Sequence, residues 1–554
     1  MLELGKKAGG AKYIFVVGGV MSGVGKGIAA SAIGLILKSK GYKVTALKID
    51  PYINVDAGTM NPTEHGEVFV LNDGDETDQD MGNYERFLDT TLTRTNYMTT
   101  GRIYQSVIER ERNLEYKGKN VEVVPDIPLE VLRRIKEAQQ KEGADITITE
   151  IGGTIGEYQN IIFLEAARML KQEYPDDVAI VMVSYVPVPK NVGEMKTKPT
   201  QYAARSLNSV GLQADMILAR AEVPLDQKRK EKIATFCNVR PENVISAPDV
   251  ESIYDVPLNY EEDNLGNTLC AVLGLPEKKS DLTEWANFVE KSKNGTREIR
   301  VAMVGKYFKS GEFVLSDVYI SVLEALKHAS YHQDLKIKID YFDSEEFEKD
   351  SEKLEELKSY DGIVVPGGFG SRGVEGIAAA VTCARENKIP YLGLCYGMHW
   401  LTIEYARNVA NLSGANTTEV DKNSAHPVIA VMESQKENVE KGTFGGTMRL
   451  GSYPCILKEG SIIRDAYGMA EVSERHRHRF EVNPKYIEQL QQAGLVFSGR
   501  SPDGVLMEIA ELPEEVHPFF VGVQFHPEFL SRPLKPHPLF TTFVSKAAAR
   551  GSSR

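Results

Sequence analysis

The stretch YIFVVGGVMSGVGKGIAASAIGLILKSKG, residues 13–41, decides the fold of the first half of the chain. An apolar run, a glycine-rich turn and a helical pattern follow one another, which is typical of a strand, a phosphate-binding loop and a helix. Backbone N–H groups in such a loop face an anion, and Lys26 is placed to reach the outer phosphates. The first glycine comes one residue early, however, and Gly27 stands where a Ser or Thr hydroxyl normally holds Mg²⁺. If the loop binds a nucleotide, the metal ligands must come from elsewhere.

The same alternation of strand-like and helical segments continues along the chain and restarts after a polar, charged stretch at residues 277–298. The apolar runs are rich in β-branched residues and lack strict alternation, which favours strands buried on both faces of a parallel sheet. These runs are residues 13–19, 44–50, 145–151, 178–186 and 215–220, then 299–307, 336–343, 362–368 and 390–395. We therefore predict two doubly wound α/β domains, residues 1–276 and 299–550, joined by a linker at 277–298.

The composition limits the function. The 554 residues are 42% hydrophobic and 26% charged, and the formal net charge is −13. This charge argues against a nucleic-acid or acidic-membrane partner, because either would require a basic face. With no apolar run of eighteen residues and no signal segment, the sequence predicts a cytoplasmic protein. The five cysteines are scattered and lack CxxC spacing, so we expect neither structural disulfides nor zinc.

The second half contains a candidate nucleophile. In GLCYGMHW, residues 393–400, Cys395 lies between two glycines, after an apolar strand and before a helical pattern. This layout is typical of a nucleophile elbow, in which the helix N-terminus favours the thiolate. A cysteine after an apolar strand is, taken alone, more often an inert core residue.

A candidate base lies further along the chain. In VGVQFHPEF, residues 521–529, His526 and Glu528 are two apart and point the same way on an extended segment, so Glu528 could orient His526 as the base for Cys395. A plain His–Pro turn is the alternative. The glycine-rich loop at residues 364–376 would supply an oxyanion hole, with Gly368 in the donor region. Together the three segments favour an enzyme.

These motifs resemble those of class I glutamine amidotransferases, in which a cysteine attacks the glutamine side-chain amide and releases ammonia. The resemblance makes Cys395 the nucleophile, His526 the base and Glu528 the residue that orients it. The residues that it places against glutamine are Gly368, Tyr396, Gly397, Met398, His399, Glu419 and Arg479. For Arg479, in the segment ERHRHRFEVN, the alternative is a solvated run of charges.

One residue departs from the pattern of this family, which usually has Gln four residues after the nucleophile, where this chain has His399. An imidazole can replace one hydrogen bond of an amide but not its donor and acceptor together. We therefore predict a raised KM for glutamine, with ammonia-driven turnover intact.

The first half contains a candidate metal site. The run at residues 48–87 is rich in Asp and Glu interleaved with Gly, Asn and Thr, which makes it a poor core and a good ligand surface. Mg²⁺ prefers carboxylate oxygens, usually one or two per ion. Asp80 and Glu150, the latter at the end of a predicted strand, are the candidates. On composition alone Asp73, Asp75 and Asp78 are equally suitable.

Over residues 11–545 the chain resembles the CTP synthase family. The resemblance is carried by GGVMSGVGKG, KIDPYINVDAGTM, HGEVFV, GNYERF, TTGRIY, EIGGTIGE, EMKTKPTQ and FCNV, followed by the amidotransferase motifs. It implies that ATP phosphorylates O4 of UTP, that ammonia from the second domain attacks C4, and that phosphate leaves to give CTP, a step of pyrimidine synthesis. A pyrimidine carbonyl oxygen is a poor leaving group until it is phosphorylated, so this order is chemically sensible.

The resemblance also assigns binding residues. For ATP they are Gly23, Val24, Gly25, Lys26, Gly27, Ile28, Lys48, Asp80, Pro248, Asp249 and Val250. For UTP, and for the inhibitor CTP, they are Ser22, Glu157, Tyr158, Gln159, Lys196, Thr197, Lys198, Pro199, Thr200, Gln201 and Lys232. It selects Asp80 and Glu150 as the Mg²⁺ ligands, and it implies GTP as an activator, a homotetramer and filaments of the kind that the family forms.

Two other functions remain open at this point. One is a related amidotransferase that acts on carboxylates, such as a corrinoid-ring amidase, although DPYINVDAGTM and KTKPTQ are not expected in it. The other is a catalytically weak assembly protein, against which the intact Lys26, Cys395 and His526 argue.

Overall fold

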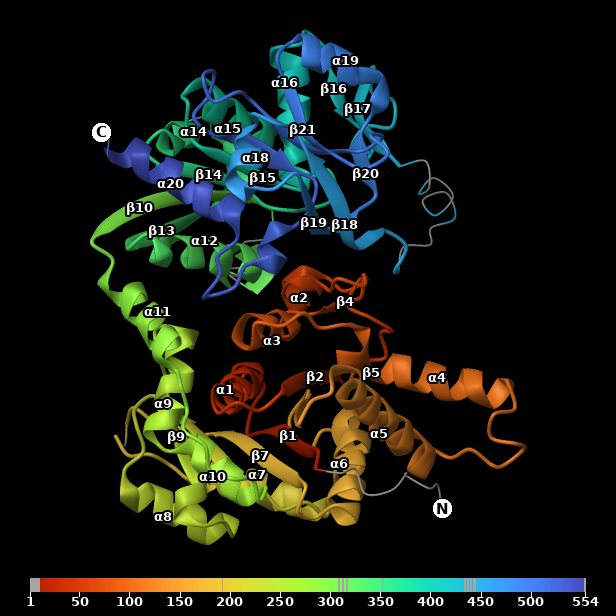
Figure 1. Ribbon diagram of the computed structural model, residues 1–554, viewed down its shortest axis with the longest axis vertical. Coiled ribbons are helices and arrows are strands. Elements are labelled where there is room, and N and C mark those ends of the chain that lie inside the picture. Colours follow the sequence, from red (N-terminus) through yellow and green to blue (C-terminus); the bar gives the residue numbers. More distant parts are fainter. Residues whose placement is uncertain are drawn as a thin grey trace. The chain divides into compact units, whose positions relative to one another are not determined.

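The chain forms two compact units in the computed structural model, which describes residues 10–191, 193–306, 309–310, 313–314, 317–350, 352–432, 435, 438, 441 and 445–552 (Figure 1). Unit 1 comprises the residues up to Asp56 and Asp80–Val289, and unit 2 comprises Ala57–Gln79 together with the chain from Glu290 onward. A short segment of the first half of the sequence thus belongs to the second unit.

Unit 1 contains a seven-stranded sheet in which every neighbouring pair is parallel. In sheet order the strands are β5 (Tyr97–Thr99), β2 (Val44–Asp50), β6 (Ile146–Ile151), β1 (Lys12–Gly19), β7 (Val178–Tyr185), β8 (Met216–Ala221) and β9 (Val244–Pro248). Because parallel strands all end at one edge, the loops that follow them gather there, at the usual ligand edge of such a sheet.

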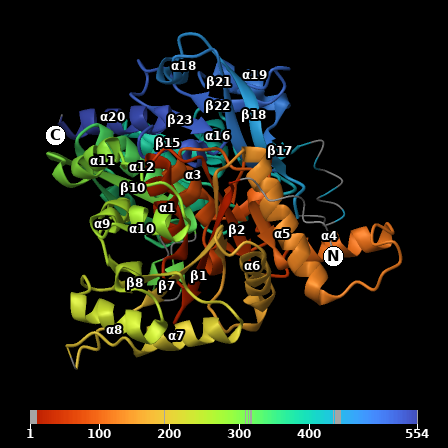
Figure 2. The ribbon, with the colours of Figure 1, turned by 60° about the horizontal axis from the view of Figure 1, so that its bottom comes forward.

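Helices cover both faces of this sheet. They are α1 (Lys26–Ser39), α3 (Asp80–Leu88), α4 (Thr100–Arg112), α5 (Val123–Glu142), α6 (Ile161–Glu173), α7 (Lys198–Ser209), α8 (Gln227–Cys237), α9 (Val256–Glu262), α10 (Leu265–Val272) and α11 (Thr283–Asn294). Tyr13, Phe15 and Val17 of β1 point into the core shared with α5, α6 and α7, whereas the alternate residues of β1 face α1. Figure 2 shows α1 and α3 on one side of β1, with α7 on the other.

Unit 2 contains a nine-stranded sheet, parallel in its first five strands and antiparallel in the rest. In order the strands are β13 (Leu335–Asp343), β10 (Arg297–Gly305), β14 (Gly362–Val365), β15 (Tyr391–Leu394), β23 (Phe520–Val523), β22 (Met507–Glu511), β21 (Val496–Arg500), β18 (Arg449–Leu457) and β19 (Glu471–His478). The smaller sheets hold β11 (Lys309–Ser310) and β12 (Phe313–Val314), and β16 (Ala415–Thr417), β17 (His426–Val431) and β20 (Phe480–Val482).

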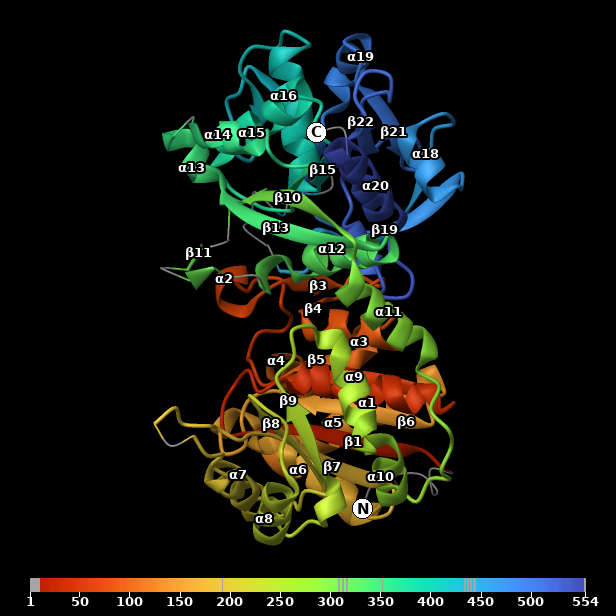
Figure 3. The same ribbon diagram turned by 90° about the vertical axis from the view of Figure 1, so that its left-hand side faces the viewer.

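Helices α12 (Ile320–His332) and α20 (Pro538–Ser552) share one core with the sheet of unit 2, and α15 (Val374–Glu386) and α16 (Tyr396–Asn408) share the core on its other face (Figure 3). The remaining helices are α13 (Ser344–Lys349), α14 (Glu352–Leu357), α18 (Ile462–Tyr467) and α19 (Pro484–Gln492). The segment 57–79 adds a short helix, α2 (Pro62–His65), and a hairpin of β3 (Val68–Val70) and β4 (Glu76–Asp78).

The predicted fold class, two α/β domains with doubly wound sheets, is confirmed. The units differ from the predicted boundaries in two places. Residues 57–79, placed by the sequence in the first domain, belong to unit 2. The expected linker contains α11, because Trp285, Phe288 and Val289 form an apolar face that packs on unit 1, where the Trp285 indole N–H donates to the Tyr254 carbonyl at 2.8 Å. Within the described residues no helix is both long and apolar enough to span a membrane.

Candidate active sites

The glycine-rich turn of unit 1 connects β1 to α1. Gly23 and Gly25 have φ angles of 69° and 90°, in the left-handed region that favours glycine. Lys26 opens α1, and its ammonium group donates to the Gly153 carbonyl at 3.0 Å. Burial lowers the pKa of Lys26, against the opposing effect of the nearby Glu150 carboxylate. A buried cation thus lies under the turn, as a polyphosphate site requires.

Asp80 explains the missing hydroxyl at Gly27. A Cβ on Gly27 would lie 1.9 Å from one oxygen of the Asp80 carboxylate. Asp80, at the start of α3, therefore occupies the space in which a Ser or Thr side chain would stand. Position 27 must therefore be glycine if the Asp80 carboxylate is to lie here, so a carboxylate stands where the hydroxyl of a Ser or Thr would be.

Lys48, near the end of β2, is surrounded by carboxylates. Its ammonium nitrogen lies 2.5 Å from Asp80 Oδ2, 2.8 Å from Glu150 Oε1 and 3.8 Å from Asp50 Oδ1. Burial would raise the pKa of Asp80, but the charge of Lys48 and hydrogen bonds from Lys48 and Asn83 lower it. Burial raises the pKa of Asp50 to about 6, with Lys48 opposing and the Glu150 charge adding to the rise.

The donor set around Lys48 suits a magnesium ion that is shared with a nucleotide. In the part of the chain that the structure describes, no group of three His, Cys, Asp or Glu side chains is arranged as a complete metal site. Mg²⁺ seldom needs one, because it usually takes one or two carboxylates and completes its shell with phosphate oxygens and water. Asp80 and Glu150, held together by one lysine, are such a pair.

A cavity of about 620 Å³ lies beside the glycine-rich turn. It brings together six of the predicted ATP residues, namely Val24, Gly25, Ile28, Pro248, Asp249 and Val250. Arg220, at the end of β8, also lines it; its guanidinium donates to Asp249 at 2.8 Å and to the Gly23 carbonyl at 3.3 Å. Arg220 carries no recognisable motif, so the sequence did not predict it. Its position at the carboxyl end of a parallel strand was the available signal.

The predicted UTP residues lie in more open surroundings. Residues 196–201 lead into α7, where the Ser184 hydroxyl donates to Thr200 at 2.9 Å, while Lys196 pairs with Glu194 at 2.9 Å. Tyr158 is 94% exposed, and Lys232 lies on the solvent side of α8. Most of the predicted UTP residues follow strands of the sheet, and they differ in burial, since Thr197, Thr200 and Gln201 are buried.

In unit 2, Cys395 lies on a strained turn between β15 and α16. Its φ angle is 50°, unusual for a residue with a Cβ, and it forms the N-cap of α16. The flanking glycines are needed: a Cβ on Gly397 would lie 2.3 Å from the Val365 carbonyl oxygen, and one on Gly393 would lie 2.6 Å from Gly397. The thiol is 3% exposed and contacts the Arg477 carbonyl at 3.9 Å.

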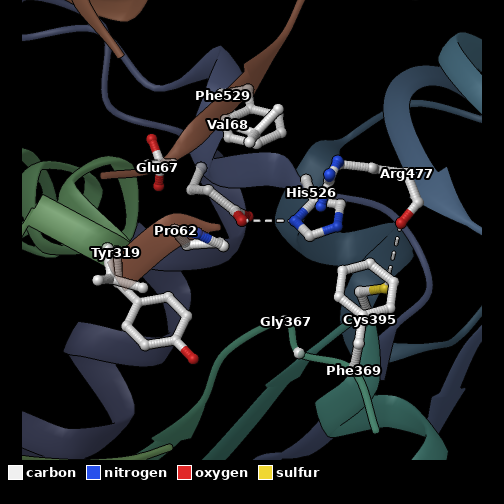
Figure 4. Close-up of a pocket in the computed structure, with 13 residues that line it drawn as sticks. Pro62, Glu67, Val68, Tyr319, Gly367, Phe369, Cys395, Arg477, His526 and Phe529 are labelled. Carbon is white, nitrogen blue, oxygen red and sulfur yellow. Dashed lines mark hydrogen bonds and ion pairs between the residues drawn. The ribbon is translucent and has the colours of Figure 1, made fainter. Parts of the chain in front are cut away.

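His526 and Glu528 form a buried pair beside Cys395, with Nδ1 and Oε1 2.7 Å apart (Figure 4). Burial alone would lower the pKa of His526, but the charges of Glu528 and Cys395, with hydrogen bonds to both, raise it to about 10. The imidazole is therefore protonated at neutral pH and lies beside the Cys395 sulfur as a cation.

These three residues open into a pocket of about 540 Å³, which we call the thiol pocket. It is lined by Pro62, Glu67, Val68, Val318, Tyr319, Gly367, Gly368, Phe369, Cys395, Arg477, His526, Glu528 and Phe529. The first three come from the segment 57–79, where the sequence predicted no part of this site. Glu67 accepts from the backbone N–H of Ser321 at 3.1 Å, and Glu76 accepts from Arg477 at 2.8 Å. Hydrogen bonds from Ser321 and Arg477 to these two glutamates therefore hold the segment 57–79 against the rest of the pocket.

The other predicted glutamine residues surround this pocket without lining it. Glu419 accepts from the Gly370 N–H at 2.7 Å, and Arg479 donates to Gln435 and to Thr447, both at 2.8 Å. The Tyr396 hydroxyl donates to the Gly370 carbonyl at 2.6 Å. Gly397 and Met398 are buried in the first turn of α16, and His399 is 3% exposed behind the nucleophile.

The family models match almost the whole chain. Residues 12–275 match the model described as CTP synthase N-terminus, and residues 314–546 match glutamine amidotransferase class-I. A CTP synthase of Caldanaerobacter subterraneus subsp. tengcongensis is 52% identical over 96% of this chain and 98% of its own length. The chain belongs to the CTP synthase family.

Other relatives agree. A CTP synthase of Thermococcus gammatolerans is 50% identical over 97% of this chain and 99% of its own length. The solved glutaminase domain of Trypanosoma brucei CTPS, with bound acivicin, is 39% identical and covers 45% of this chain and 94% of that chain, at a TM-score of 0.42. The recognition of the CTP synthase family from the sequence is confirmed, and a corrinoid-ring amidase is no longer needed as an alternative.

Proposed function

We propose that the chain converts UTP to CTP with ATP and glutamine, and that each unit performs one part of the reaction. The observation that carries the proposal is that one polypeptide holds Cys395 beside a protonated imidazole in unit 2 and a glycine-rich loop beside a lysine–carboxylate cluster in unit 1. The first arrangement releases ammonia and the second activates its acceptor. We place the enzyme in the cytoplasm.

In unit 2 the Cys395 thiolate attacks the side-chain amide carbon of glutamine. The oxyanion forms against backbone N–H groups near Gly368 and after the elbow, and protonated His526 gives its proton to the departing ammonia. Water, activated by the now neutral His526, then hydrolyses the glutamyl thioester and regenerates the thiolate. Glu419 and Arg479 bind the amino and carboxylate groups of glutamine, with Gly397 and Met398 contributing through their backbone.

In unit 1 the γ-phosphoryl group of ATP passes to O4 of UTP. Lys26 and Lys48 are buried cations that balance the transferred charge, and the turn at residues 22–28 binds the phosphates through its N–H groups. Asp80 and Glu150 would hold Mg²⁺, which supplies further positive charge to the phosphate oxygens when bound. Ammonia attacks C4 of the phosphorylated pyrimidine, and phosphate leaves.

Regulation and assembly complete the proposal by family resemblance. GTP would activate the glutamine reaction, CTP would inhibit at the UTP residues, and a homotetramer would form, with filaments beyond it. The exposure of Tyr158, Lys198 and Lys232 in the single chain is consistent with a site that neighbouring copies complete.

The proposal predicts a double separation between nitrogen sources. Cys395→Ala should abolish CTP formation from glutamine, by at least about 10³-fold, and leave formation from ammonium chloride intact. Asp80→Asn should reduce both by about 10²-fold or more. The measurement is CTP formed from UTP and ATP with each nitrogen source, with and without GTP. Glutamine-fed synthesis that survives Cys395→Ala would contradict the assignment.

A further inference from the structure

Cys395 has a second polar neighbour that the reaction scheme does not use. Gln524 directly follows β23, is fully buried, and directs its side-chain nitrogen to Cys395 Sγ at 3.7 Å. Its backbone N–H is bonded to the Glu508 carbonyl at 2.8 Å, which fixes the backbone beneath the side chain. The amide therefore points at the reacting sulfur from a rigid part of the sheet.

His399 holds the other end of this amide. Its Nε2 lies 3.0 Å from Gln524 Oε1, and it is placed in the first turn of α16, where its backbone N–H bonds to the Cys395 carbonyl at 3.2 Å. Neither His399 nor Gln524 lines the thiol pocket. His399, Gln524 and the sulfur thus form a short buried chain of contacts behind the nucleophile.

The direction of the hydrogen bonds follows from what each group can donate. A carbonyl oxygen only accepts, so the hydrogen bond to Gln524 Oε1 requires the proton of His399 to be on Nε2. The other neutral tautomer would place two acceptors 3.0 Å apart. With Oε1 fixed by the histidine, the NH₂ group faces the sulfur, and an N–H donor stabilises a thiolate better than a thiol. Burial lowers the pKa of His399 to about 4, against the opposing hydrogen bond to Gln524, so the ring stays neutral and adds no charge.

We propose that Gln524 stabilises the Cys395 thiolate through its amide N–H and that His399 is a positioning residue that fixes the orientation of this amide. The inference rests on the proposed role of Cys395 as the nucleophile. It changes the role expected of His399, from a contact with glutamine to support of the sulfur. The imidazole at this position is then a part of the nucleophile's environment.

The test measures how the reactivity of the Cys395 sulfur depends on pH. Wild type, His399→Ala, His399→Gln and Gln524→Glu are alkylated with iodoacetamide from pH 5 to pH 10 without glutamine, and modification of Cys395 is followed by peptide mass spectrometry. His517→Gln is the matched control, because His517 is also buried with a pKa lowered by burial to about 4 but bonds only to backbone groups at Ala384 and Phe519. Thermal unfolding of each variant checks that it is folded.

In His399→Ala we expect the midpoint of the pH profile to lie about one unit higher, with alkylation slowed about tenfold at pH values below both midpoints. Gln524→Glu should slow it further, because a carboxylate cannot donate to the sulfur and repels the thiolate. His399→Gln, whose amide can donate to Oε1, should restore the rate to within about threefold of wild type, and His517→Gln should not change the profile.

Steady-state hydrolysis of glutamine distinguishes the two roles of His399. Positioning of the sulfur predicts that His399→Ala lowers kcat by the same factor as alkylation, with KM for glutamine within about twofold. A changed KM with an unchanged alkylation profile would assign His399 to glutamine binding and overturn the proposal. So would unchanged profiles in folded His399→Ala and Gln524→Glu. Failure of Cys395→Ala to stop glutamine-fed synthesis would instead contradict the proposed function itself.

Discussion

The thiol pocket of unit 2 and the lysine–carboxylate cluster of unit 1 handle buried charge in opposite ways. Around Cys395 the charges are matched, because the His526 imidazolium is paired with the Glu528 carboxylate and both residues are at most 8% exposed. Around Lys48 the carboxylates of Asp50, Asp80 and Glu150 outnumber the ammonium groups of Lys48 and Lys26, and burial raises the pKa of Asp50 to about 6.

The comparison indicates which site is complete within the chain. In the thiol pocket, Cys395 and the His526–Glu528 pair are already side by side within unit 2. If the proposed function holds, the cluster in unit 1 has an excess of negative charge where a polyphosphate binds, so a cation would be needed to accommodate the substrate. The buried His526–Glu528 pair holds the thiol pocket in place, whereas the lysine–carboxylate cluster of unit 1 needs bound ligands to balance its charge.

The largest effect on catalysis should come from breaking the His526–Glu528 ion pair in the thiol pocket. Glu528→Gln keeps the shape of the side chain but removes the charge that holds His526 protonated. We expect kcat for glutamine-fed synthesis to fall by about 10³-fold, as is typical when the orienting carboxylate of a catalytic histidine is neutralised. Ammonium-fed synthesis should not change. Equal loss with both nitrogen sources would show that the two sites are not separable in this way.

In unit 1, Gly27→Ser tests whether Asp80 and the glycine depend on each other. The new Cβ would collide with the Asp80 carboxylate, so we expect about a 10²-fold loss of CTP synthesis with either nitrogen source. Gly34→Ala, in the same helix as Gly27, is the matched control, since its Cβ would meet the ends of the Leu88 and Ile148 side chains, at 2.7 Å and 3.4 Å, rather than a carboxylate. If the serine variant is as active as wild type, a hydroxyl can replace the carboxylate and our account of Gly27 is wrong.

The raised pKa of Asp50 predicts that the stability of the protein depends on pH. Because the pKa of Asp50 is raised above its unfolded value, the folded protein loses stability as the pH rises through about 6. Asp50→Asn should therefore be more stable than wild type above pH 6, by about 3 kcal/mol, and the difference should vanish below pH 4.

Urea unfolding without nucleotide, from pH 4 to pH 8, measures this difference. Added Mg²⁺ should stabilise wild type more than the variant, because the cation offsets the same excess of charge. A variant that is less stable than wild type at pH 8 would mean that Asp50 is a net stabilising partner of Lys48.

The smallest effect is expected at the open edge of unit 1. Arg220→Ala removes the link between Asp249 and the Gly23 carbonyl, two groups that are well exposed to water. We expect KM for ATP to rise about fivefold with little change in kcat, since an exposed ion pair contributes about 1 kcal/mol or less. Initial rates against ATP concentration measure this. A large fall in kcat would place Arg220 at the transferred phosphate instead.

Much of both candidate sites could be predicted because their motifs are contiguous in the sequence. The turn at residues 18–27 and the elbow at residues 393–397 need particular residues at fixed spacing, since glycine alone permits the positive φ angles and the close backbone contacts found there. The apolar runs predicted the ends of five strands of the unit 1 sheet to within one residue. They did not predict β5, which is short, or β9, which ends in a proline.

What the sequence by itself determined is therefore local: the strands of the two sheets, the glycine-rich turn, the elbow that carries Cys395, and the family. Only the tertiary structure decided that residues 57–79 wall the thiol pocket, that Arg477 and Arg220 line the sites, and that His399 contacts an amide rather than the pocket. The physical reason is that spacing along a chain fixes which side chains share a turn or a strand face, whereas contacts between distant segments depend on how those segments pack.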